Sequence, residues 1–172
     1  LEGIYYWTFA PKKQIQFRWY GGLFLKNQAK NNSFNFGISK INDYNFTYSL
    51  LGQSATSGLY SQEFILAEGG FKSYVGSSAN QWILALNTDV PIWKIFGIYM
   101  DLGMYKNKGN LARFVWDSGV RLSLVPNVLE VYFPVQSALG FEPALERYDK
   151  RIRFSLNLEV DNLIRTAKKI IQ

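Results

Sequence analysis

The sequence contains no cysteine and no histidine among its 172 residues. The first absence excludes disulfides, thiolate nucleophiles and thiolate metal ligands, and the second excludes the common zinc sites and nucleophiles paired with a histidine base. We therefore expect no catalytic residue, no metal site, no cofactor and no enzymatic activity in this chain. It also lacks any apolar run near the roughly 18 residues that a membrane-spanning helix needs, which excludes a helical membrane protein.

The excess of charge is modest and positive. The sequence has 19 Lys and Arg against 13 Asp and Glu, a formal net charge of +6. Such an excess fits either a nucleic acid or an anionic membrane. Because the basic residues are scattered along the chain, we expect no nucleic-acid partner.

Alternation of large apolar residues with small or polar ones is the main pattern of the sequence. In FGIYMDLGMY (96–105) every second residue is large and apolar, and the residues between are Gly, Tyr and Asp. The same period of two runs through 82–90, 114–124, 129–136 and 152–160. A period of two is that of a β-strand with one apolar face. The sequence therefore predicts five consecutive strands.

The N-terminal half shows less regular alternation. It occurs at 4–9, 15–25, 34–38 and 44–50, and at 60–68 three successive apolar residues obscure its phase. We predict about ten antiparallel strands in all, each near the nine to eleven residues that cross a bilayer when tilted. An open arc of ten strands in lipid would expose unpaired backbone, so we expect these strands to be the C-terminal part of a larger barrel.

Short and long connections alternate along the chain. The segments 91–94 and 125–127 are tight, whereas 106–112 and 138–149 are long and polar or flexible. Outer-membrane barrels are built in this way, with short periplasmic turns and long external loops. We therefore place the two short turns in the periplasm.

Alternation alone does not identify the medium at each face. A soluble antiparallel sandwich or lipocalin-like barrel also alternates, with its apolar face inward. Here the polar face mixes Gly and Tyr with isolated charges of both signs, and the apolar faces of the five strands carry no Lys or Arg. A Lys or Arg on a lipid face near the midplane costs roughly 2–4 kcal/mol. We therefore predict an all-β transmembrane barrel, and a soluble barrel that binds a small apolar ligand is an alternative.

The predicted barrel sorts the side chains of its strands by face. Those expected to face lipid are Trp82, Ile98, Trp116, Phe133 and Phe154. Those expected to form a charge network in the lumen are Asp101, Arg121, Arg153, Asp117 and Glu130. Aromatic residues at strand ends, expected in the interfacial girdles, are Trp82, Trp93, Phe114 and Tyr105.

After the last strand the sequence changes its period. In DNLIRTAKKIIQ (161–172) the apolar residues fall at helical spacing, Arg and Lys occupy the other side, and Asp161 can cap the helix. Such a helix either packs on its own domain or contacts an anionic lipid surface. We predict a barrel portion over 1–160 and an amphipathic periplasmic tail over 161–172.

Residues 60–160 resemble the C-terminal strands of the BamA-type superfamily, sixteen-stranded outer-membrane barrels that insert or translocate other proteins. IYMDLGMY resembles a strand with an aromatic-x-Asp-x-Gly pattern, and WDSGVRLSLVPNVLEVYFPV resembles a hairpin ending in an aromatic-Phe-Pro segment. RIRFSLNL resembles the closing strand, which serves as an assembly signal. The resemblance implies that the chain meets the outer-membrane assembly machinery through 151–160.

In that superfamily an Arg-Gly-Phe loop folds into the lumen, where its Arg meets the Asp of the strand just described. The matching stretch GGFKSY retains Gly70 and Phe71 but has glycine in place of the Arg, and Lys72 is the nearest cation. The resemblance thus implies a lumen loop of Gly70, Phe71 and Lys72. Lys72 can pair with Asp101 as a point charge, without the bidentate fork of Arg. Alternatively, Arg121 or Arg153 pairs with Asp101, or Asp101 joins a mixed-charge network.

A second resemblance covers more of the chain. LLGQSATSGLYSQEFILAEGGFKS, NQWILALNTDVPIWKIFGIYMDLG and NVLEVYFPV are similar to the barrel that follows zinc-dependent gluzincin aminopeptidase domains in some Gram-negative bacteria. This implies a membrane anchor or scaffold in the outer membrane of a Gram-negative bacterium, with outer-membrane lipids as partners. Any peptidase activity would belong to residues upstream. A BamA-like insertion or translocation barrel is the alternative function in this class.

Overall fold

A computed structural model describes residues 1–11, 13–27, 36–37, 50–51, 64–65, 71–73, 75, 78–125 and 128–156. Within these ranges the chain is all-β, as predicted, with two short 3-10 helices, η2 (Glu142–Ala144) and η3 (Tyr148–Lys150). The predicted tail, 161–172, lies outside the described residues. No helix in the described ranges has the length and apolarity needed to cross a membrane.

Six of the described strands have nine residues or more, and they form the body of the fold. They are β1 (Glu2–Ala10), β2 (Lys13–Leu23), β7 (Trp82–Trp93), β8 (Phe96–Lys106), β9 (Arg113–Val125) and β10 (Leu129–Ser137). The shorter strands are β3 (Phe36–Gly37), β4 (Leu50–Leu51), β5 (Phe64–Ile65), β6 (Ser78–Ala79), β11 (Gly140–Phe141) and β12 (Arg153–Leu156). The five predicted C-terminal strands are confirmed as β7, β8, β9, β10 and β12, the last as far as Leu156.

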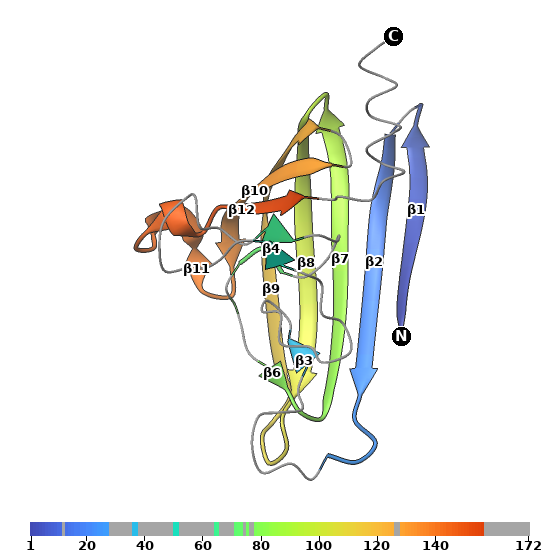
Figure 1. Ribbon diagram of the computed structural model, residues 1–172, viewed down its shortest axis with the longest axis vertical. Helices are drawn as coiled ribbons and strands as arrows, with labels where there is room; N and C mark the ends of the chain where they lie inside the picture. The colour runs from blue at the N-terminus through green and yellow to red at the C-terminus, as the bar shows by residue number, and fades with distance from the viewer. Residues whose placement is uncertain are drawn as a thin grey trace.

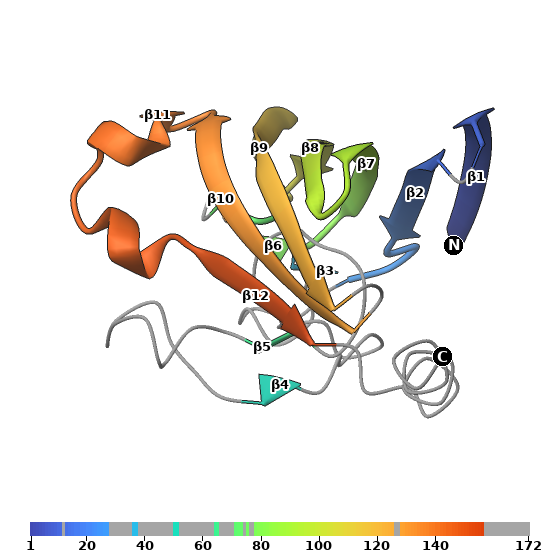
Figure 2. The same ribbon diagram turned by 90° about the horizontal axis from the view of Figure 1, so that it is seen from above.

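The long strands lie side by side in one sheet. Its order is β1-β2-β7-β8-β9-β10-β12-β5-β4, and β11 pairs with the end of β10. The sheet curves into an arc, and the small β3–β6 sheet lies on its concave side (Figures 1 and 2). The two ends of the order, β1 and β4, do not pair with each other in the described ranges, so the sheet is not closed there.

One pairing departs from the predicted antiparallel arrangement. β5 runs parallel to β12, with Phe154 opposite Phe64, and antiparallel to β4. Of the predicted strand 60–68 the structure describes only these two residues of β5. Because the 60–68 segment has no clear alternation, its sequence specifies neither a face nor a neighbour.

The connections follow the predicted division into short and long, but the short turn predicted at 91–94 lies at 94–95, because β7 continues through Trp93. β7 and β8 are joined by Lys94 and Ile95, with Lys94 in the left-handed region at a φ of 45°. At the opposite end of these strands, residues 107–112 connect β8 to β9. The predicted turn 125–127 is described only at Val125, the last residue of β9.

The long connection after β10 is ordered by one buried carboxylate. Glu142 is fully buried, accepts a hydrogen bond from Ser137 Oγ and pairs with Arg151 Nη1 at 2.8 Å. Nearby, Tyr148 Oη donates to the carbonyl oxygen of Pro134 at 2.9 Å. These contacts pin the loop to the end of β10. The sequence analysis did not single out Glu142.

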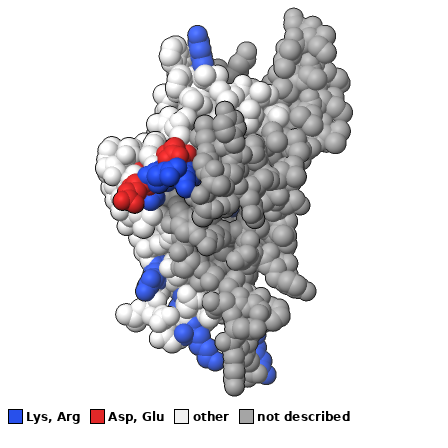
Figure 3. Space-filling model, turned by 60° about the vertical axis from the view of Figure 1, so that its left-hand side comes forward, with Lys and Arg blue, Asp and Glu red and all other residues white. Residues whose placement is uncertain are grey.

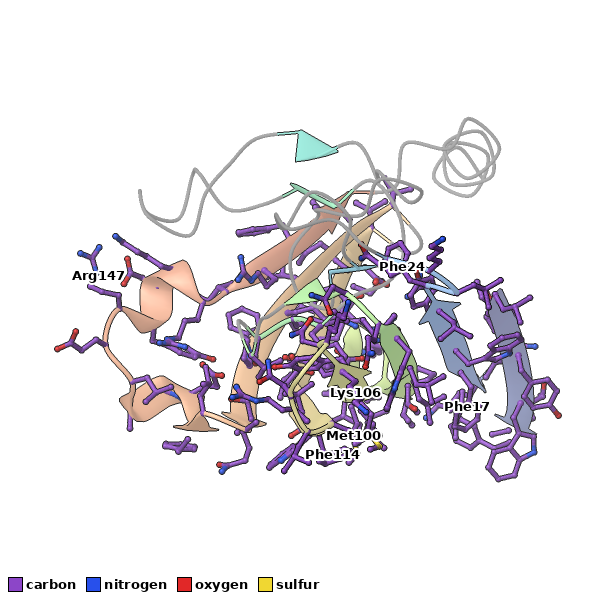
Figure 4. The ribbon with its side chains drawn as sticks, turned by 90° about the horizontal axis from the view of Figure 1, so that it is seen from below. Phe17, Phe24, Met100, Lys106, Phe114 and Arg147 are labelled. Carbon is purple, nitrogen blue, oxygen red and sulfur yellow. The ribbon has the colours of Figure 1, made fainter. Side chains whose placement is uncertain are left out.

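The two faces of the sheet differ sharply along β8. The large apolar residues of one parity, Phe96, Ile98, Met100 and Met104, are between 40% and 48% exposed. The residues of the other parity are buried on the concave side. In Figure 4, which looks from below, Met100 and Phe114 point away from the grey trace.

An apolar cluster fills part of the concave side near the end with loop 107–112. Its buried members are Tyr20, Phe71, Val75, Ala79, Ile83, Tyr105 and Val115, and Phe24 packs against them. The girdle prediction is therefore wrong for Tyr105, which is only 4% exposed. Its position in β8 has the parity of Asp101, and parity decides its face even though it lies close to the strand end.

Candidate functional site

A row of polar side chains crosses five strands on the concave side. Arg18 of β2 lies opposite Asn87 of β7, and Asn87 lies opposite Asp101 of β8. Asp101 lies opposite Asp117 of β9, and Asp117 lies opposite Ser137 of β10. Directly opposed residues share one face of a sheet, so this register gathers the five side chains in one band. All five are buried, and the two aspartates have no exposed surface.

Lys72 contacts this band from outside the long strands. Its Nζ lies 3.1 Å from Oδ2 and 3.2 Å from Oδ1 of Asp101. The same Oδ1 accepts a hydrogen bond from Asn87 Nδ2 at 2.8 Å, and Arg18 Nη1 donates to Asn87 Oδ1 at 3.0 Å. Of the partners considered for Asp101, Lys72 thus forms the ion pair.

The segment 71–73 is held at further points. The backbone N–H of Ser73 donates to Asp117 Oδ2, and Arg153 Nε donates to the carbonyl oxygen of Lys72 at 3.0 Å. Phe71, which is 3% exposed, packs in the apolar cluster. Gly70, the first residue of the predicted loop, lies outside the described residues. One ion pair, two backbone contacts and one buried ring therefore fix 71–73 against the concave side.

A second charged group lies closer to the short β7–β8 turn. Arg121 Nη1 is 3.0 Å from Asp89 Oδ2 and 2.9 Å from Glu130 Oε1. Tyr132 Oη donates to the other oxygen of Glu130 at 2.6 Å. Because the Arg121 side chain of β9 bridges a carboxylate of β7 and one of β10, it is engaged in this group.

Two tyrosines connect the groups. The rings of Tyr99 and Tyr132 meet edge to face, with centroids 5.4 Å apart and planes at 81°. Lys72 Nζ lies 5.3 Å from the Tyr99 centroid and 5.2 Å from that of Tyr132, within the range of a cation–π interaction. The ammonium group therefore sits between one carboxylate and two aromatic faces.

The glycines of the concave face make room for this network. A Cβ at Gly119 would lie 2.2 Å from the carbonyl oxygen of Phe133 and 2.8 Å from Tyr99 Oη. A Cβ at Gly97 would lie 3.1 Å from Nε of Arg121. The Tyr99 side chain thus lies over Gly119 of the neighbouring strand, and the Arg121 side chain lies over Gly97. Neither glycine has a side chain that would occupy this space. This explains why Gly, Tyr and charged residues share one parity of the strands.

Substituting Gly119 by alanine tests this explanation. The new methyl group would clash with backbone and with the Tyr99 ring, and we expect a loss of about 1–3 kcal/mol in the free energy of unfolding. Denaturant titration of the folded chain measures this loss of stability. Gly21→Ala is the matched control, because its nearest neighbour is the flexible end of Leu84 at 3.2 Å. Equal stability of the two variants would contradict the packing described.

The structure divides the predicted residues between the two faces. The register places all five predicted charges on the concave side and all five predicted lipid-facing residues on the opposite, convex side. Ile98 is 48% exposed, and Trp82, Trp116, Phe133 and Phe154 are half-buried. Val131, which shares the convex parity, is buried. No group of three metal-ligating side chains comes together in the part of the chain that the structure describes.

Several contributors to the site were not singled out from the sequence, namely Arg18, Ser73, Asn87, Asp89, Tyr99, Tyr132 and Ser137. Arg18 and Asn87 have the right parity within their strands, so alternation assigns their face. Their pairing depends on the β2–β7 register, which no local pattern specifies because residues 24–81 intervene. Ser73 contributes only its backbone N–H, which leaves no signal in the side-chain pattern.

In chemical terms the site is a network of acidic and basic side chains. Its carboxylates are Asp89, Asp101, Asp117 and Glu130, and its cations are Arg18, Lys72, Arg121 and Arg153. Such a network is suited to holding a segment in place, because the contacts to 71–73 include an ion pair, hydrogen bonds, cation–π interactions and apolar packing. Comparison of the chain with protein-family models, curated proteins and solved structures gives no match.

Proposed function

We propose that this chain is a portion of an outer-membrane β-barrel and serves as a membrane anchor or scaffold. The observation that carries the proposal is the polarity of the sheet. Charged side chains are buried on its concave side, and large apolar side chains are exposed on its convex side. In a water-soluble sheet of one layer the opposite arrangement is expected.

The exposed apolar residues of the convex side form a continuous surface. Leu84 lies opposite Met104, which lies opposite Phe114. Farther along the same face of β8 lie Met100 and Ile98. These five side chains are between 40% and 57% exposed. Soluble monomers rarely expose contiguous apolar patches larger than a few hundred Å². Hydrocarbon is the medium in which such a surface is stable.

Basic and aromatic residues at the strand ends also support a sheet that spans a membrane. Lys13 and Lys94 lie at the end with the short β7–β8 turn, and Lys26, Lys108 and Arg113 lie at the opposite end. Basic side chains also stand at the two ends of the side seen in Figure 3. Lys94 Nζ lies 5.2 Å from the exposed ring of Trp93, a pairing that suits an interface.

The outer edge of β1, which pairs with no further strand in the described part of the chain, supports a larger barrel. β1 ends the sheet order, and large side chains are exposed on both of its faces: Ile4 and Tyr6 on one, Tyr5 and Trp7 on the other. In lipid each orphaned backbone group costs several kcal/mol. We therefore propose that further strands pair with β1 in the complete barrel.

Two features favour an anchor over a translocating barrel. The segment 71–73 is fixed to the concave side at several points, and its cation is Lys72 rather than the Arg of the superfamily that the sequence resembles. A fixed segment occupies the interior that a substrate would need. Because the sequence resembles barrels that follow aminopeptidase domains, we propose that the strands tether such a domain to the outer membrane.

Membrane fractionation tests the proposal. We expect the full chain, expressed with an outer-membrane export signal, to stay in the outer-membrane fraction after a wash in alkaline carbonate. Once extracted, it should remain monodisperse only in detergent. A chain that is monodisperse in detergent-free buffer would contradict the proposal and favour the soluble ligand-binding barrel.

A further inference from the structure

An apolar groove of about 970 Å³ runs along the convex side between β2 and the strands β7 to β9. It lies toward the end of the sheet that carries loop 107–112. Its lining residues include Trp19, Leu84, Leu86, Leu102, Met104 and Phe114. The volume is near the upper end of the roughly 300–1,000 Å³ typical of small-molecule sites.

Gly21 opens this groove. It lies on the convex face of β2 between Trp19 and Leu23, which are 46% and 63% exposed, and opposite Leu84. A Cβ at Gly21 would meet Leu84 Cδ2 at 3.2 Å. The missing side chain thus leaves a channel between two protruding residues, with Leu84 on its far side.

A cation stands at the mouth of the groove. Lys106 lies opposite Trp82, which lies opposite Leu23, so the three share the last row of the convex face. Lys26, Lys108 and Arg113 are exposed near the same end. None of these four cations forms an ion pair with a carboxylate of the described ranges. Figure 4 looks onto this end and labels Lys106 and Phe114.

We propose that the groove binds an acyl chain of a phosphate-bearing lipid, whose phosphate is contacted by Lys106. This rests on the proposed function, which supplies the membrane and its orientation. Apolar walls suit the acyl chain, and a cationic rim that has no carboxylate partner within the described ranges suits an anionic headgroup. Since long loops mark the external end, the lipid is the phosphorylated saccharolipid of the outer leaflet, lipopolysaccharide.

Native mass spectrometry of the full chain, purified in detergent, tests the site. The probe is lipopolysaccharide, with phosphatidylglycerol and phosphatidylcholine in parallel arms. We expect Lys106→Gln to lower the retained lipopolysaccharide about fivefold, the effect of one interfacial cation. Gly21→Leu should lower it at least as much, because the new side chain fills the groove. Lys94→Gln, at the opposite end, is the matched control and should retain the wild-type amount.

Three results would overturn the proposal: wild-type retention in both groove variants, an equal loss in Lys94→Gln, or retention of either phospholipid as strong as that of lipopolysaccharide. Should Gly21→Leu fail to fold, the surface substitution Lys106→Gln carries the test alone. Fractionation of the same variants separates the two proposals. Variants in the membrane with unchanged lipid retention overturn the groove only, whereas a chain in the soluble fraction overturns the proposed function.

Discussion

Replacing Asp101 by alanine is expected to lower the free energy of unfolding by about 3–5 kcal/mol, as when one partner of a buried ion pair is removed. Asp101 is fully buried and accepts contacts from both Lys72 and Asn87. Without it, a largely buried ammonium group loses its carboxylate, and the main side-chain anchor of 71–73 is lost. The effect should appear in urea titrations of the chain refolded in lipid vesicles.

Two further variants test whether the loss of stability comes from breaking the ion pair between Lys72 and Asp101. Asp149→Ala removes a carboxylate from an exposed pair with Arg147 and should leave stability nearly unchanged. Lys72→Met in the Asp101→Ala background should recover part of the loss, since no unpaired charge is then buried. An Asp101→Ala variant within about 1 kcal/mol of the wild type would contradict the role given to the network.

The second large effect is expected on the other face of the same strand. Met100 is 46% exposed at the middle of β8 and points to the convex side. If this side faces hydrocarbon, Met100→Arg costs about 2–4 kcal/mol. If it faces water, the same change at a half-exposed position stays within about 0.5 kcal/mol. The folded fraction in lipid vesicles across a urea series measures the difference.

Leu111→Arg is the matched control for Met100→Arg. Leu111 is 89% exposed in the loop between β8 and β9, which lies in water in either account. We expect its substitution to leave stability unchanged. Equal stability of the Met100→Arg and Leu111→Arg variants would show that the convex side does not contact lipid.

Alternation predicted the strands well because it is a local property. β8 alternates without a break, so its bounds and the faces of Ile98 and Asp101 followed from the sequence. The same rule placed Arg121, Arg153 and Glu130 on the concave side. The face of Tyr105 was predicted wrongly, because its position near the strand end was given more weight than its parity within the strand.

The pairings within the site were not predictable in the same way. They depend on register between strands distant in sequence, as for Arg18 and Asn87, and on where the segment 71–73 lies. Alternation assigns a face but not a partner, so Arg121 and Arg153 remained rival candidates for Asp101 beside Lys72, which only the resemblance implied. The buried Glu142 lies in a long loop, where no periodicity marks an inward side chain.

The medium at the convex side is measured most directly by a spin label at Met100→Cys. The sequence has no cysteine, so this variant carries a single thiol, and Tyr99→Cys places it on the concave side as a control. In lipid vesicles we predict that collisions with dissolved oxygen exceed those with a water-soluble nickel complex at position 100. A label at position 100 that collides freely with the nickel complex would contradict the account.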